Sequence, residues 1–121
     1  MIASKSLLAV LSATVSLVHA GCYPSGTTFG DLPGDVDRTI EAFCDYIDQR
    51  EFRASQIITR CVTFGDKQLQ LAIQNNGGDN GHVPYHDCVA NFQWEKGGCP
   101  HGSNHDYGDY YFNIDPNEGT C

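Results

Sequence analysis

Four of the five histidines lie in the second half of the chain, in two pairs with three residues between the members. Two histidines at this spacing on a helix can share a metal ion. However, Pro84 lies between His82 and His86, and the residues between His101 and His105 include Gly and Ser, which are typical of a loop. Neither pair is therefore a helical metal site, and the sequence predicts neither a metal nor another cofactor.

General acid–base chemistry is a second use for these side chains. His86, His101 and His105 could act with Glu95 and Arg60 in a small secreted hydrolase or ribonuclease. No motif orders these residues, and the Gly-x-Ser-x-Gly signature of serine hydrolases is absent. We therefore predict a protein without catalytic activity and keep the hydrolase or ribonuclease as the alternative.

Aromatic, amide and acidic side chains gather between residues 75 and 115. A sugar presents hydroxyl groups around an apolar ring face, so amides and carboxylates can bind its hydroxyls while an aromatic ring stacks on the face. Gly102 and Gly108 would let backbone amides approach such a ligand. The candidate ligand-binding residues are Trp94, Asn104, Asp106, Tyr107, Asp109 and Tyr111.

An even number of cysteines, six, is typical of a disulfide framework in a short exported chain. No close Cys-x-x-Cys pair points to zinc instead. Fifteen pairings are possible, and spacing cannot choose among them. Our hypothesis, in which the last residue clamps the final strand, pairs Cys99 with Cys121, Cys22 with Cys61 and Cys44 with Cys88.

The N-terminal segment has the pattern of a signal peptide. Lys5 precedes an apolar stretch from Leu7 to Val18, and Ala20 is a small residue at the expected cleavage site. The stretch is too short to span a membrane. We therefore predict a leader at 1–20 and one exported domain at 21–121, which is extracellular and does not insert into membranes.

The charge of the predicted mature chain argues against nucleic acid as a partner. Because Lys5 belongs to the leader, residues 21–121 hold six basic against fifteen acidic residues, a net charge of −9. Such a surface repels phosphate backbones and anionic membranes.

Hydrophobic periodicity then predicts the elements that position these side chains. Apolar residues recur at helical spacing over 35–50 and 84–98, whereas 55–64 and 68–75 read as two strands of an antiparallel hairpin. In the last strand, predicted from Tyr110 to Ile114, alternation places Phe112 in the core and Tyr111 on the wet face. Asp115-Pro116-Asn117 is expected to close that strand with a turn.

These patterns indicate a small disulfide-rich α+β domain with an antiparallel sheet. The expected order is α-β-β-α-β, with further short strands between Cys99 and Gly108. Two segments, "CYPSGTTFG" near the mature start and "FNIDPNEGTC" at the end, together with a helix that carries an inward cysteine, resemble the small secreted fungal glycan-binding lectins of the Y-three type. The resemblance implies an α-β-β-α-β-β-β order.

The resemblance also implies a function. We expect a secreted, lectin-like carbohydrate-binding protein whose partners are extracellular glycans or glycoproteins, acting as an effector on another organism. A protein-binding effector or toxin is a further alternative, and a homodimer is left open.

Overall fold

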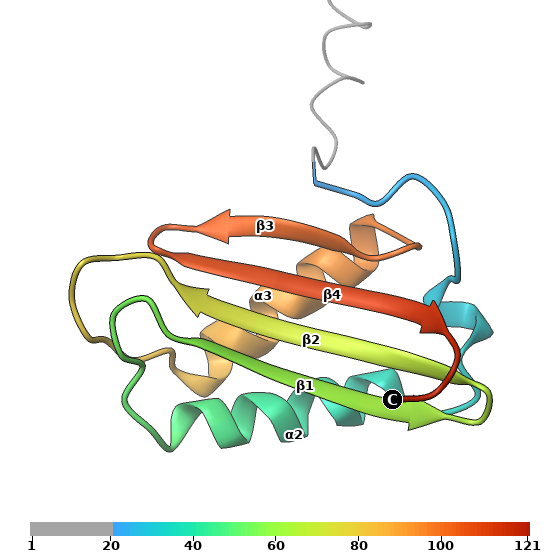
Figure 1. The fold of residues 1–121 in the computed structure, drawn as a ribbon, viewed down its shortest axis with the longest axis horizontal. Coiled ribbons are helices and arrows are strands. Elements are labelled where there is room, and N and C mark those ends of the chain that lie inside the picture. The colour runs from blue at the N-terminus through green and yellow to red at the C-terminus, as the bar shows by residue number, and fades with distance from the viewer. Residues whose placement is uncertain (1–20) are drawn as a thin grey trace, which may run out of the picture.

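The structure of the protein, a computed structural model, describes residues 21–121. The predicted leader at 1–20 lies outside these described residues. Two layers make up the fold: a four-stranded antiparallel sheet and a layer of two helices on one of its faces (Figure 1). The α+β class and the expected α-β-β-α-β order with a further short strand are therefore confirmed. Two strands of the described residues follow the second helix, where the resemblance implied three.

Seven elements follow one another along the chain. They are η1 (Phe29–Asp31), α2 (Val36–Asp48), β1 (Ile57–Phe64), β2 (Lys67–Asn75), α3 (Tyr85–Gly98), β3 (Ser103–Tyr107) and β4 (Tyr110–Glu118). The strands lie in the sheet in the order β1-β2-β4-β3.

Helix α2 begins and packs as its sequence predicts. The carboxylate of Asp35 accepts a hydrogen bond of 3.0 Å from the backbone N–H of Arg38, which satisfies one of the free donors at the helix start. The apolar stripe of the helix, which includes Ile40 and Phe43, is buried against the sheet and α3.

Helix α3 has a less regular apolar pattern than α2. Pro84 immediately precedes it as the N-cap residue, and Cys88 and Phe92 are buried as expected. The third fully buried side chain is an acid, Glu95, which the apolar pattern does not predict. The helix therefore buries a mixed face against β3 and β4.

The predicted hairpin and the alternation in the last strand are confirmed. β1 and β2 pair from Ile57 opposite Gln74 to Phe64 opposite Lys67. In β4, Phe112 and Ile114 are buried on the helix side.

The predicted end of the last strand is wrong, because β4 continues through Pro116 to Glu118. β3 pairs with β4 only as far as Ile114, so Pro116 lies where β4 has β2 as its single strand neighbour. A proline there removes no hydrogen bond from a second partner strand.

One of the three hypothesised disulfides is confirmed: Cys44–Cys88 joins α2 to α3. The other two pairings are wrong, since Cys22 bonds to Cys99 and Cys61 bonds to Cys121. No described cysteine is free.

The topology gives the reason for both corrections. Cys22 forms a β-bridge with Ser103, which brings the N-terminal segment beside the end of α3 and therefore beside Cys99. The tail after β4 crosses β2, where Gln68 donates to the backbone oxygens of Gly119 and Thr120, and so reaches Cys61 in β1. The hypothesis failed because it placed the end of the chain beside the start of its own last hairpin.

No helix within residues 21–121 has the length and apolar character needed to cross a membrane.

Candidate functional site

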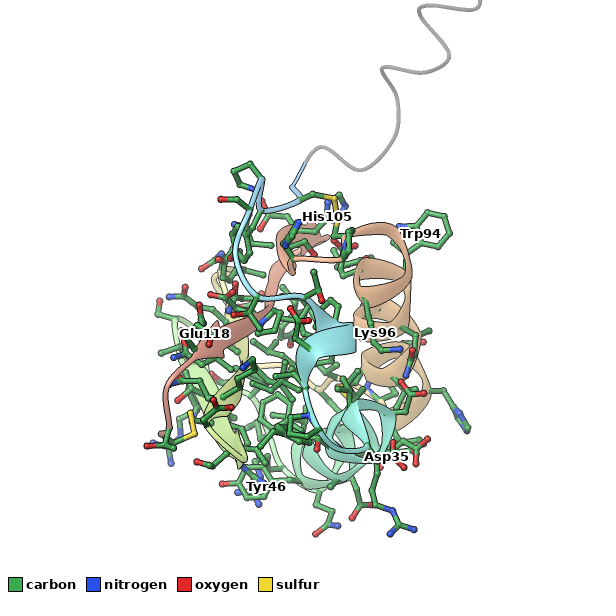
Figure 2. All side chains as sticks on the ribbon, turned by 90° about the vertical axis from the view of Figure 1, so that its right-hand side faces the viewer. Asp35, Tyr46, Trp94, Lys96, His105 and Glu118 are labelled. Atoms are coloured by element: carbon green, nitrogen blue, oxygen red, sulfur yellow. A yellow bond between two sulfur atoms is a disulfide. The ribbon has the colours of Figure 1, made fainter. Side chains whose placement is uncertain are left out.

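One face of the sheet carries no helix among the described residues. Figure 1 views this face with α2 and α3 behind it, and Figure 2 shows the helices on one side of the sheet only. We call it the open face. Strand register places these side chains on it: Ile57, Thr59, Cys61 and Thr63 of β1; Gln68, Gln70, Ala72 and Gln74 of β2; Tyr111, Asn113, Asp115 and Asn117 of β4; and Asn104 and Asp106 of β3.

A shallow hollow lies near the middle of the open face. Ala72, whose side chain is short, forms its floor, and its cross-strand neighbours Thr59 and Asn113 stand on either side. Gln70 adds a further amide to the wall. The hollow has a volume of about 220 Å³, below the roughly 300 Å³ at which pockets for drug-sized ligands begin, so it suits one small ring.

A tyrosine from the N-terminal segment completes one side of the open face. The Asn104 amide donates to the Tyr23 hydroxyl over 3.2 Å, and that hydroxyl in turn donates to Asn113. Tyr23 is held there by its backbone N–H, which donates to the Gly102 oxygen over 2.9 Å. The adjacent Cys22–Cys99 disulfide fixes the segment.

Tyr111 lies between this network and two acids. Burial raises its pKa, and Tyr23, Asp106 and Asp115 raise it further. The side chain is half-buried, not fully exposed as the alternation predicts, because Tyr23 lies against it. Tyr111 therefore remains a neutral phenol that can both donate and accept a hydrogen bond.

Three of the six predicted site residues come together on the open face. Asn104 lies opposite Asn113, and Asp106 lies opposite Tyr111, in the β3–β4 pairing. Sequence reasoning missed Tyr23, Asn113 and the hollow over Ala72. The cysteine beside Tyr23 was the available signal, but its partner could not be inferred from spacing.

The structure separates the other three predicted residues from this group. Tyr107 faces α3, where its hydroxyl donates to Glu95. Asp109 lies in the β3–β4 turn, and its backbone oxygen accepts from the Asn76 N–H over 2.7 Å. Trp94 projects from α3 away from the sheet, with 65% of its surface exposed (Figure 2). The site was predicted as one cluster because the short strands expected between Cys99 and Gly108 had no assigned bounds, so the alternation of faces in β3 could not be used.

Glu95, His101 and His105, which were considered for acid–base chemistry, each contact different groups. Glu95 is 1% exposed and accepts from the hydroxyls of Ser103, over 2.8 Å, and of Tyr107, which leaves little access for a substrate. His101 contacts the Gly26 oxygen at 2.8 Å, and His105 packs edge-on against Tyr107. Residues 21–121 contain no group of three or more His, Cys, Asp or Glu side chains arranged to hold a metal ion.

The buried contact between Tyr107 and Glu95 predicts a loss of stability in alkali. Burial, and then the hydrogen bond to Glu95 and its charge, raise the pKa of Tyr107 well above its ordinary value. The unfolded chain ionises this phenol near pH ~10, whereas the folded chain keeps it protonated. The stabilisation is thus complete below that pH and is lost as the pH rises further.

We expect the free energy of unfolding, measured in urea, to fall between about pH 9 and pH 11. Tyr107→Phe should flatten this decline, while the raised pKa values of Tyr110 and Tyr111 maintain part of it. An equally steep decline in Tyr107→Phe would contradict the assignment to Tyr107.

The sequence model of one protein family, described as glycan binding domain Y3, matches residues 35–121. No curated protein matches the chain. The matched segment contains both α-helices and all four strands, whereas Tyr23 and its disulfide-bonded neighbour Cys22 precede it.

Proposed function

Since the chain belongs to the glycan binding domain Y3 family, and is therefore a carbohydrate-binding protein, we propose that its open face is the surface that binds the sugar. The observation that carries the proposal is the Asn104–Tyr23–Asn113 network, which lies beside Tyr111 and in which Asn113 also lines the hollow. It combines aromatic rings with amides at one place, which is the combination that sugar recognition needs.

The sugar would bind with its hydroxyls over the hollow and its apolar ring face against tyrosine. Asn113 and Gln70 carry amides that both donate and accept, so they match hydroxyl groups of either orientation. Ala72 leaves room for the ring to approach the sheet. Because neighbouring strands hold all these groups, the site is formed before the ligand arrives, and binding costs little conformational entropy.

The charge of the open face favours uncharged glycans. The two charged side chains that strand register places on it, Asp106 and Asp115, are both acidic. Arg60 also lines the hollow, but its guanidinium lies on the helix side, over the rings of Phe43 and Tyr46. A sialylated or sulfated glycan would bring another negative charge to this surface, and like charges at short range oppose binding. Neutral sugars instead offer hydroxyl donors to both carboxylates.

The proposed setting is extracellular. We infer that residues 1–20 direct export and are removed, and that residues 21–121 act outside the cell as a non-catalytic lectin on glycans or glycoproteins of another organism. Three disulfides in a domain of this size support an oxidising compartment.

Tyr111→Ala tests the location of the site. The variant should fold but bind the neutral glycan chosen from an array at least about tenfold more weakly, a loss of about 1.4 kcal/mol, because the stacking ring is gone. Isothermal titration calorimetry measures the affinity, and thermal unfolding verifies the fold.

Trp94→Ala is the matched control, since it removes another aromatic side chain from the helix side of the molecule. Its affinity should equal that of the wild type. If Trp94→Ala lost binding while Tyr111→Ala kept it, the site would lie on α3 and the open-face assignment would be wrong.

A further inference from the structure

A second pocket lies on the helix side of the sheet, between the first half of α3 and the β3–β4 turn. Its volume is about 430 Å³, within the range of small-molecule sites. Tyr107 and Tyr110 line it from the two strands, and Gly108 lies in the turn between them. Tyr110 and Tyr111 are adjacent in β4 and point to opposite faces, so this pocket shares no side chain with the open face.

Two polar side chains of α3 that line the pocket make no hydrogen bond or ion pair within the described residues. Asp87 and Asn91 are four residues apart, so they lie on the same side of the helix. Within residues 21–121 neither the Asp87 carboxylate nor the Asn91 side-chain amide has a hydrogen-bond or ion-pair partner. Their hydrogen-bonding capacity is therefore available to a ligand.

The aromatic walls opposite them are fixed in position. Tyr110 packs edge-on against the buried Phe52, with ring centroids 5.5 Å apart. Tyr107 packs edge-on against the buried Phe112 at 5.3 Å, and its hydroxyl is held by Glu95. Fixed rings lose little freedom when a ligand packs on them, and they supply apolar area that a polar surface lacks.

We propose that this pocket is a second carbohydrate site, which takes one uncharged sugar ring. The inference rests on the proposed function for its ligand class, but not for its location. Asp87 would accept from two sugar hydroxyls, Asn91 would donate to a third group, and the tyrosines would contact the apolar part of the ring. The Asp87 carboxylate disfavours acidic sugars for the same reason as on the open face.

Two sites on opposite faces of one sheet make a single chain bivalent. Such a protein links two glycans, or binds a dense glycan surface with an avidity above either single affinity, without forming a dimer. The open face would bind the end of one glycan chain, and the second pocket would bind the end of another.

NMR titration tests the pocket directly, because each site has its own backbone amides. The probes are N-acetylglucosamine, N-acetylgalactosamine, galactose, mannose and fucose, each added to the isotope-labelled protein 21–121 in the oxidised state. We expect at least one of them to shift the amides of Asp87, Asn91 and Gly108, and N-acetylneuraminic acid to shift them less. In the double variant Asp87→Ala/Asn91→Ala, the apparent affinity obtained from the titration of the pocket amides should fall at least tenfold.

The matched variant is Tyr111→Ala, which removes the open-face ring and should leave the response of the pocket unchanged. Conversely, Asp87→Ala/Asn91→Ala should leave shifts at Asn104 and Asn113 unchanged, so a failure of the open face and a failure of the pocket are distinguishable. The proposal is overturned if none of the five sugars shifts the pocket amides, if the shifts persist in the double variant, or if Tyr111→Ala abolishes them. Thermal unfolding of both variants confirms that each is folded.

Discussion

Phe112→Ala is expected to lower the free energy of unfolding by roughly 3–5 kcal/mol, the usual cost of emptying a buried aromatic site. The Phe112 side chain is 1% exposed and lies near the start of β4, where β4 is paired on both sides. Its ring packs edge-on against Phe92 of α3 at 5.0 Å and against Tyr107 of β3 at 5.3 Å. The variant therefore leaves a cavity where three elements meet, and urea denaturation measures the loss.

The neighbouring residue provides the control. Tyr111→Ala removes a ring of similar size one position earlier in β4, but on the open face. We expect it to cost about 1 kcal/mol, since it loses the contact with Tyr23 but leaves the core filled. Equal losses for the two variants would mean that the face assignment of β4 does not describe the protein in solution.

Hydrophobic periodicity predicts those elements whose local sequence pattern matches their burial in the fold. In α2 the apolar stripe and the Asp35 cap predict the same helix, and the structure contains that helix. In β2 the alternation of Leu69, Leu71 and Ile73 with glutamines indicates a strand covered on one face, and those three residues are buried. Local pattern and tertiary burial coincide in both elements, so a single sequence is enough.

β3 could not be read in this way. Its sequence, Ser-Asn-His-Asp-Tyr, has little apolar alternation. It forms a strand because β4 pairs with it on one side and Gly21 accepts a 3.1 Å hydrogen bond from Asn104 on the other. Buried Ser103 and Glu95 hydrogen-bond to each other across β3 and α3, so polar residues occupy positions that a periodicity argument reserves for apolar ones.

The same limit applies to the candidate site. Asn104 and Asp106 were found from residue type alone, and Tyr111 from residue type and the alternation in β4. The common face of the three residues depends on the register between β3 and β4, which the sequence does not define. Tyr23 reaches the face through long-range contacts that no local pattern encodes. Trp94 was included because it is aromatic, and the arrangement of helix and sheet decides that it points elsewhere.

Removal of the Cys44–Cys88 disulfide is the second change with a large expected effect. Cys44→Ala with Cys88→Ala should lower the free energy of unfolding by about 4 kcal/mol, because the bond closes a long loop in the unfolded chain. Both cysteines are fully buried between α2 and α3, so the loss of two sulfur atoms also leaves unfilled space in the core. Against the 5–15 kcal/mol typical of a domain, this loss is a large fraction of the total stability.

The double variant Cys61→Ala with Cys121→Ala separates the contribution of chain entropy from that of core packing. That disulfide spans 60 residues against 44 for the buried one, so chain entropy alone makes its removal slightly more costly. Both of its cysteines are exposed, however, and their loss opens no cavity. We therefore expect the buried pair to be the more costly to remove in urea unfolding of the two double variants, despite its shorter loop. The reverse order would show that the disulfides stabilise this domain through chain entropy alone, with no contribution from packing between α2 and α3.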